Sequence, residues 1–111
     1  MNSKASASAS GAVTAHDYFL LEGTIDAHCD KLLKEIPSRV RHTRVYFDFS
    51  KAGRINSMGI ALLLRCFKEI GSRAEIRLEG LSPMHNMLFK MTGVFLLAAP
   101  AQSPGREGGV R

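Results

Sequence analysis

The chain has 111 residues, of which 45% are hydrophobic and 23% are charged. This balance is typical of a single globular domain with a modest core, and it excludes an extended disordered chain. No apolar run approaches the roughly 18 residues that a membrane-spanning helix needs, and the N-terminal residues lack the apolar stretch of a signal peptide. We therefore expect a cytoplasmic protein without a membrane span.

The formal net charge is +5, and much of the excess lies in one basic segment. Such a segment could attract a phosphate backbone or an anionic lipid. Asp30 and Glu35 interrupt it, however, and no aromatic side chains that could stack on bases alternate with its cations. The pattern favours a solvated helix face that runs into a polar loop. The basic residues are Lys31, Lys34, Arg39, Arg41 and Arg44.

Composition divides the chain into three parts. Residues 1–15 are rich in Ser and Ala and contain nothing large to bury, which predicts a disordered tail. Residues 100–111 repeat Pro and Gly without apolar periodicity, which predicts a flexible tail. The ordered domain is expected between residues 16 and 99.

The first half of this domain predicts a strand, a helix and a second strand. The apolar run at 18–22, closed by Gly23, indicates the first strand. Helical spacing of apolar residues follows, with Asp26 as a cap and Pro37 ending or bending the helix. Residues 44–50 alternate cleanly and predict the second strand. The helical positions are Cys29, Leu32, Leu33, Ile36 and Val40, and the strand turns Val45, Phe47 and Phe49 to one face.

The second half repeats this alternation of helix and strand. A strong helical stripe ends at Gly71, and residues 74–79 then alternate as a strand does. Ser82 is a cap for a further helix that begins with Pro83 and ends at Gly93. Residues 94–98 predict a short edge strand. The two helical stripes are Ile60, Leu63, Leu64, Phe67 and Ile70, then Met84, Met87, Leu88 and Met91.

The predicted order of elements is β-α-β-α-β-α-β, which indicates an α/β fold with an open sheet covered by helices. Right-handed crossovers make neighbouring strands parallel wherever a helix intervenes. The sequence leaves open whether all helices lie on one face of that sheet.

The loop before the second main helix is the segment most suited to a function. A strand that ends near Phe49 runs through this loop into the N-terminus of an apolar helix, where Asn56 or Ser57 occupies the capping position. The free N–H groups of a first helical turn favour negative charge, so a phosphoryl group on Ser57 would be stabilised there. Arg54 is close enough in sequence to contribute. A plain helix cap explains the same residues without any modification.

Three stretches of the chain, taken together, resemble the STAS domain family, which includes sulfate-transporter cytoplasmic domains and bacterial anti-sigma-factor antagonists. Their order and spacing match the family between about residues 18 and 97. The resemblance implies a mixed sheet of about four to five strands packed with helices. The three stretches are Gly23-Thr24-Ile25-Asp26, then Val45 to Ser50 with Ile55 to Ile60, and Leu78 to Pro83 with Leu88 to Val94.

The resemblance also implies a function in partner switching and transcription regulation. Antagonists of this family bind a histidine-kinase-like ATPase that is both a serine kinase and an anti-sigma factor. Phosphorylation of a loop serine breaks the complex, and a PP2C-type phosphatase restores it. Ser57 matches the phosphoacceptor, and the partner-binding positions that we carry over are Asp26, Arg54, Asn56, Ser57, Met58 and Gly59.

The loop departs from the family pattern at two positions. The family usually has Asp-Ser-Ser/Thr-Gly, whereas this chain has Asn56-Ser57-Met58-Gly59. Asn56 removes a carboxylate beside the acceptor, which could impair recognition by the kinase or reduce repulsion of the phosphate. Met58 replaces a second hydroxyl and could be either a docking residue or a buried one.

The remaining candidates for chemistry favour structural roles. The four histidines are dispersed, and Cys29 and Cys66 are expected to be buried free thiols. The methionine stripe is expected in the core, although it could form part of a lipid-contacting or partner-contacting groove. The sequence contains no catalytic set and no metal-ligand or cofactor motif, so we expect no enzyme, no metal and no cofactor.

Two other functions remain open at this point. The chain could be a constitutive accessory subunit of a membrane lipid-transport ABC ATPase, as some standalone members of the family are. A more remote reading is a basic nucleic-acid-binding domain, which predicts salt-dependent binding to nonspecific DNA.

Overall fold

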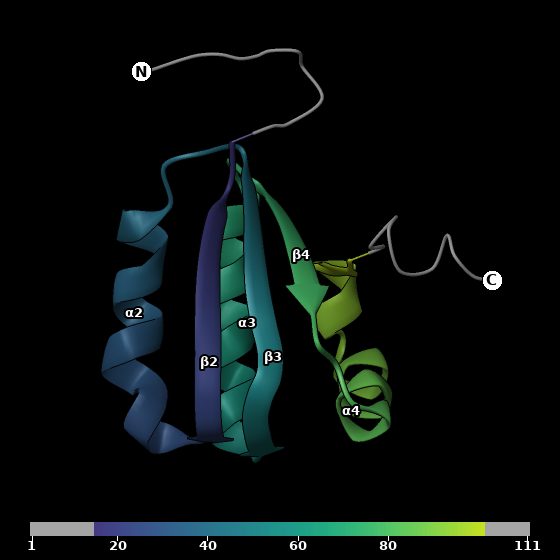
Figure 1. Cartoon of the computed structure of the whole chain (residues 1–111). Helices are drawn as coiled ribbons and strands as arrows, with labels where there is room; N and C mark the ends of the chain where they lie inside the picture. Colours follow the sequence, from purple (N-terminus) through teal and green to yellow (C-terminus); the bar gives the residue numbers. More distant parts are fainter. Residues whose placement is uncertain (1–14, 102–111) are drawn as a thin grey trace, which may run out of the picture.

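Parallel strands joined by helices make up the computed structural model, which describes residues 15–101 (Figure 1). The tails predicted at the two ends fall largely outside these residues. The elements in chain order are β2 (Asp17–Ile25), η1 (Ala27–Cys29), α2 (Asp30–Arg39), β3 (Arg44–Ile55), α3 (Ser57–Gly71), β4 (Glu75–Glu79), α4 (Pro83–Thr92), η2 (Val94–Leu96) and β5 (Ala99–Pro100).

Within residues 15–101 the strands form one four-stranded sheet in the order β2-β3-β4-β5, and its three pairings are parallel. Phe47 lies opposite Phe19 on one side and Leu78 on the other. This arrangement confirms the predicted α/β fold class and the expected number of strands, while the pairings among the described residues are all parallel where the resemblance implied a mixed sheet. Spatial order follows chain order, so right-handed crossovers return each helix to the same face of the sheet. Figure 1 shows α3 behind β2 and β3 on that face.

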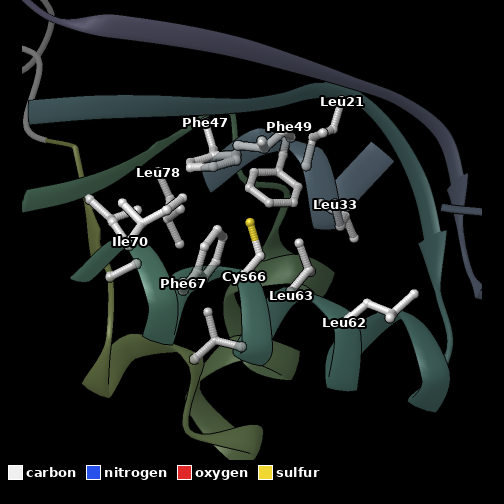
Figure 2. Close-up of a cluster of buried hydrophobic side chains, with 14 of the residues drawn as sticks. Leu21, Leu33, Phe47, Phe49, Leu62, Leu63, Cys66, Phe67, Ile70 and Leu78 are labelled. Atoms are coloured by element: carbon white, nitrogen blue, oxygen red, sulfur yellow. The ribbon is translucent and has the colours of Figure 1, made fainter. Parts of the chain in front are cut away.

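The core lies between this helical layer and the sheet. The predicted alternation of β3 is confirmed, since Val45, Phe47 and Phe49 are buried while Tyr46 and Asp48 between them are only half-buried. Figure 2 shows the strand residues facing Leu63, Cys66 and Phe67 of α3. Phe47 and Phe67 meet edge to face with their ring centroids 4.9 Å apart, a geometry that aromatic pairs favour.

The predicted cap at Ser82 is confirmed. Asp26 was predicted to cap α2, but it caps the short 3-10 helix η1 before it, and the N-cap residue of α2 is Cys29, which makes no side-chain cap hydrogen bond. The Asp26 carboxylate accepts a hydrogen bond from the backbone N–H of His28. Ser82 caps α4 in a capping box with His85, and Pro83 is the first helical residue. Pro37 lies in the last turn of α2, which continues only to Arg39. These local signals depend on a few neighbouring atoms, which is why the sequence displays them.

The sequence prediction was wrong at two strand boundaries. Gly23 does not end the first strand, because β2 continues to Ile25 with a change of register against β3. Residues 94–98 do not form an edge strand. Val94–Leu96 is a 3-10 turn that follows the left-handed Gly93, and the last strand begins only at Ala99. A short apolar run has the same pattern in a turn, a helix or a strand.

The methionine stripe of α4 was predicted in the core, and this prediction was wrong. Met84, Met87 and Met91 are exposed, whereas His85 and Phe89 occupy the buried face of the helix. Two apolar stripes compete on this short helix. The aromatic stripe faces the sheet because its rings pack on Phe49, with the Phe49 and Phe89 centroids 5.3 Å apart.

The two cysteines differ in their surroundings. Cys66 is buried, as expected, and burial followed by the charge of Glu69 raises the pKa of its thiol to about 12. Cys29 is only partly buried at the end of η1, so the prediction of a buried thiol was wrong there. Within the described part of the chain, no helix combines the length and the apolar character needed to cross a bilayer.

Candidate functional site

The candidate loop lies where the long strand β3 passes into α3. β3 continues well past its pairing with β4, which ends at Asp48 and Glu79, and it follows β2 to the Ile25–Ile55 pair. The loop therefore lies at the carboxyl end of the sheet, where only β2 and β3 remain paired. Ser57 is the first residue of α3 and is exposed to solvent.

Asn56, rather than Ser57, is the capping residue of α3. Its side-chain oxygen accepts a hydrogen bond from Gly59 N at 2.8 Å, while its backbone oxygen accepts one from Ile60 N at 2.9 Å. This leaves the Ser57 hydroxyl outside the cap. Among the described residues, no side chain forms a hydrogen bond with Ser57 Oγ.

Gly59 fixes the distance between the helix and the sheet. A Cβ atom at this position would lie 2.1 Å from the backbone oxygen of Ile25 and 2.8 Å from its carbonyl carbon. The first turn of α3 therefore packs directly against the end of β2, and Asn56 N donates a 3.3 Å hydrogen bond to the same Ile25 oxygen. The Asn56-to-Gly59 segment is held by backbone atoms on both sides, with Ser57 and Met58 facing outward.

Two other positions that the family resemblance assigned to partner binding, Asp26 and Arg54, lie in different surroundings. Asp26 follows Ile25 and so lies beside the loop, but its carboxylate is bound to the backbone of His28. That hydrogen bond, opposed by desolvation, holds the pKa of Asp26 below its ordinary value. Arg54 precedes the buried Ile55, so its side chain points to the opposite side of β3 from the core. The structure does not bring Arg54 to Ser57.

Met58 is half-exposed at 49% and is not part of the core. Its side chain lies beside Ser57 on the first turn of α3, so an apolar group is next to the exposed hydroxyl. Of the two possibilities for Met58, the structure contradicts the buried one, and the docking role stays a prediction. Methionine is flexible and polarizable, which suits it to adaptable contacts.

His85 holds the strand segment that leads into the loop, and the sequence analysis did not predict this role. It is 2% exposed, and its Nε2 donates a 2.8 Å hydrogen bond to the Gly53 carbonyl of β3, while Nδ1 accepts the Ser82 N–H. The ring thereby links the start of α4 to the strand segment that leads into Asn56. The sequence analysis identified Ser82 as the cap, but it indicated neither the capping-box partner His85 nor the contact of His85 with Gly53.

A family model for the STAS domain matches residues 10–102, which is most of the chain. The chain therefore belongs to the STAS domain family, and the resemblance inferred from the three stretches is confirmed. No curated protein matches the sequence significantly.

Solved structures agree with this fold. A sulfate transporter family protein from Wolinella succinogenes aligns with a TM-score of 0.65 and 13% identity over 72% of this chain and 68% of its own. The anti-sigma factor antagonist SpoIIAA in its unphosphorylated form aligns with a TM-score of 0.61 and 18% identity over 89% of this chain and 96% of its own. The Bacillus cell fate determinant SpoIIAA in its phosphorylated form gives 0.56 and 18% with the same coverage.

Proposed function

We propose that this protein is an anti-sigma-factor antagonist that binds a kinase of the histidine-kinase-like ATPase type and is released when that kinase phosphorylates Ser57. One observation carries the proposal: Ser57 is exposed on the first turn of α3, in a loop whose sequence resembles the family's phosphoacceptor loop. A PP2C-type phosphatase restores the unmodified form. Both partners would meet the protein in the cytoplasm.

The position of Ser57 suits a charge switch. The first-turn N–H groups of α3 partly stabilise a phosphate, because a helix N-terminus carries positive partial charge. Only Gly59 N is occupied by the Asn56 cap. Phosphorylation would add about −1.5 to −2 charges beside the half-exposed Met58. A partner surface that packs on Met58 would have to desolvate this charge, and the complex would weaken.

Asn56 fits this mechanism. It supplies the cap that Asp supplies in most family loops, and being neutral it does not repel the phosphate. We therefore expect phosphorylated Ser57 to be tolerated by the fold itself, so that the modification changes binding rather than stability. In this proposal the protein acts by binding its partner and carries out no reaction of its own.

The experiment is phosphorylation by the cognate kinase with ATP, followed by intact-mass measurement and binding calorimetry. We expect a single phosphate on the wild-type protein and none on Ser57→Ala. Ser57→Asp should weaken binding to the kinase about 100-fold, which corresponds to about 2.8 kcal/mol, while Ser57→Ala should bind as the wild type does.

Ser38→Asp is the matched control, because it adds the same charge to an exposed serine near the C-terminus of α2, at the other end of the helical layer. It should leave binding unchanged. Equal affinity of the Ser57→Asp and Ser57→Ala proteins, or a phosphate that persists in Ser57→Ala, would contradict the proposal.

A constitutive accessory subunit of a lipid-transport ABC ATPase is the second candidate. The helix cap at Asn56 is complete without phosphorylation, which suits a subunit that is not regulated. The exposed Met58 would then be a permanent contact with the ATPase. A transporter ATPase recovered with the protein, with affinity unaffected by Ser57→Asp, would support this function over the first.

The nucleic-acid-binding alternative receives less support. Two cations of the basic segment form i,i+4 ion pairs on α2, Lys34 with Asp30 at 3.3 Å and Arg39 with Glu35 at 3.5 Å. This pairing is typical of a solvated helix face. We expect no salt-dependent binding of nonspecific duplex DNA, and electrophoretic mobility at low and high salt tests this.

A further inference from the structure

A groove lies between α3 and residues 92–97, which include the end of α4 and the 3-10 helix η2. It encloses about 500 Å³ and is open to solvent. Leu64, Arg65 and Lys68 of α3 form one wall, and the other wall comes from the segment around η2. The residues of the second wall are Thr92, Gly93, Leu96 and Leu97.

The two walls differ in character. Arg65 and Lys68 are exposed, and no acidic side chain lines the groove or pairs with them among the described residues. The opposite wall is apolar, and Leu96 is 89% exposed. The groove therefore combines an exposed leucine with two cations that have no acidic partner among the described residues.

The groove shares a face of α3 with Ser57. Ser57, Leu64 and Lys68 are separated by seven and four residues, a spacing that places them on one side of a helix. At 1.5 Å per residue, Leu64 lies about 10 Å along the axis from Ser57. A rod-shaped ligand in the groove can therefore extend to the phosphorylation loop.

We propose that the groove binds an amphipathic helix of the protein partner, with its acidic side on Arg65 and Lys68 and its apolar side on Leu96 and Leu97. This inference rests on the proposed function in that it names the partner segment that the Ser57 phosphate repels. The two opposite walls match the two faces of such a helix. An acidic segment that extends toward Ser57 also explains the effect of the phosphate, because like charges brought together in an interface repel each other.

Other occupants match the groove less well. Residues 1–14 contain no acidic residue and residues 102–111 contain one, so neither end of the chain supplies an acidic helix. A second copy would bring further positive charge, given the net charge of +5. A membrane surface is flat, whereas the groove is hollowed, and basic interfacial helices present bulky apolar residues along their whole length.

The test uses a synthetic helical peptide of about four turns with Leu on one face and Glu on the flanking positions. Its binding to the full chain is followed by fluorescence anisotropy, and the site is mapped by amide chemical shifts. We expect the largest shifts at Leu64 to Lys68 and at Thr92 to Leu97. The double variant Arg65→Glu/Lys68→Glu should weaken binding about tenfold or more.

Two matched controls separate the groove from general charge and apolarity. Lys31→Glu/Lys34→Glu makes the same charge change on α2, and Leu32→Ser removes a half-exposed leucine there. Both should bind the peptide as the wild type does, whereas Leu96→Ser should weaken binding. A peptide with Lys in place of Glu should not bind.

Three outcomes would overturn the proposal. They are shifts centred elsewhere, equal weakening by the α2 and α3 charge variants, and stronger binding to vesicles of equal phosphatidylglycerol and phosphatidylcholine that depends on Arg65 and Lys68. The last outcome identifies the groove as a membrane-contacting surface. These outcomes concern only the groove, because they are measured with the peptide and with vesicles. The Ser57 switch is tested separately, with the intact kinase and the Ser57 variants.

Discussion

At the residue scale, the missing Cβ of Gly59 and the side-chain oxygen of Asn56 determine how the candidate loop packs. Gly59 has no Cβ, so the first turn of α3 packs against the backbone of Ile25, and Asn56 closes the same turn through its side chain. The position of Ser57 follows from these two contacts. A family motif that ends in glycine thus has a packing reason as well as a functional one.

We predict that Gly59→Ala destabilises the protein by about 3 kcal/mol or more, because the added methyl group overlaps backbone atoms that cannot rotate away. Urea unfolding followed by circular dichroism measures the loss. Gly71→Ala is the control at the other end of α3. No atom lies within 4 Å of its added Cβ, so it should be neutral or stabilise by up to about 1 kcal/mol. Equal effects of the two substitutions would contradict the proposed close approach.

At the scale of the elements, α4 shows how one helix can have two apolar stripes of which only one is buried. His85 and Phe89 fill the space beneath Phe49, with the His85 and Phe89 rings stacked at 16° between their planes. The three methionines lie on the other side in solvent. The helix α4 therefore packs on the sheet through His85 and Phe89.

We predict that Phe89→Ala lowers the free energy of unfolding by about 3–5 kcal/mol, because it leaves a cavity in the core. Met87 lies only two residues away but on the exposed stripe, so Met87→Gln should change the same quantity by less than about 0.5 kcal/mol. Urea midpoints of the two variants provide the comparison. A large loss from Met87→Gln would show that the methionine stripe is packed.

At the scale of the whole molecule, Asp17 joins the start of the sheet to the α2–β3 connection. Its Oδ2 accepts hydrogen bonds from the backbone N–H groups of Arg41 and His42, each at 2.9 Å. Burial raises the pKa of the Asp17 carboxyl, but these hydrogen bonds outweigh it, and the pKa lies below its ordinary value of 3.8. Asp48 has a similarly lowered pKa. Its partial burial is outweighed by hydrogen bonds from Tyr18 Oη and Ser50 N.

A carboxyl group with a lowered folded-state pKa stabilises the protein at pH values above its unfolded pKa. That contribution is lost as the pH falls through the folded value. We therefore predict that stability declines as the pH decreases from about 5 to below 3.8. Asp17→Asn should cost about 1 kcal/mol at neutral pH and flatten this decline.

Thermal unfolding at a series of pH values measures this dependence. Asp30→Asn is the control, because Asp30 forms an exposed ion pair with Lys34 and such pairs contribute little. A decline of the same steepness in the wild type and in Asp17→Asn would show that Asp17 does not contribute to it.

The sequence by itself determined the alternation of strands and helices, the cap at Ser82, and the position of Ser57 at the start of a helix. These features depend on residues close together in the chain, and periodicity records them directly. It also predicted the family, because the three matching stretches keep their order. It left Asn56 and Ser57 as alternative caps, which only the atomic contacts resolved.

Tertiary structure decided which of two similar patterns is buried. It placed Phe89 inward and the methionines outward, turned residues 94–96 into a 3-10 helix, and connected His85 to Gly53 across 32 residues. Each of these depends on which surface another element presents. The periodicity of neighbouring residues cannot predict that surface, because the surface forms only when distant segments pack together.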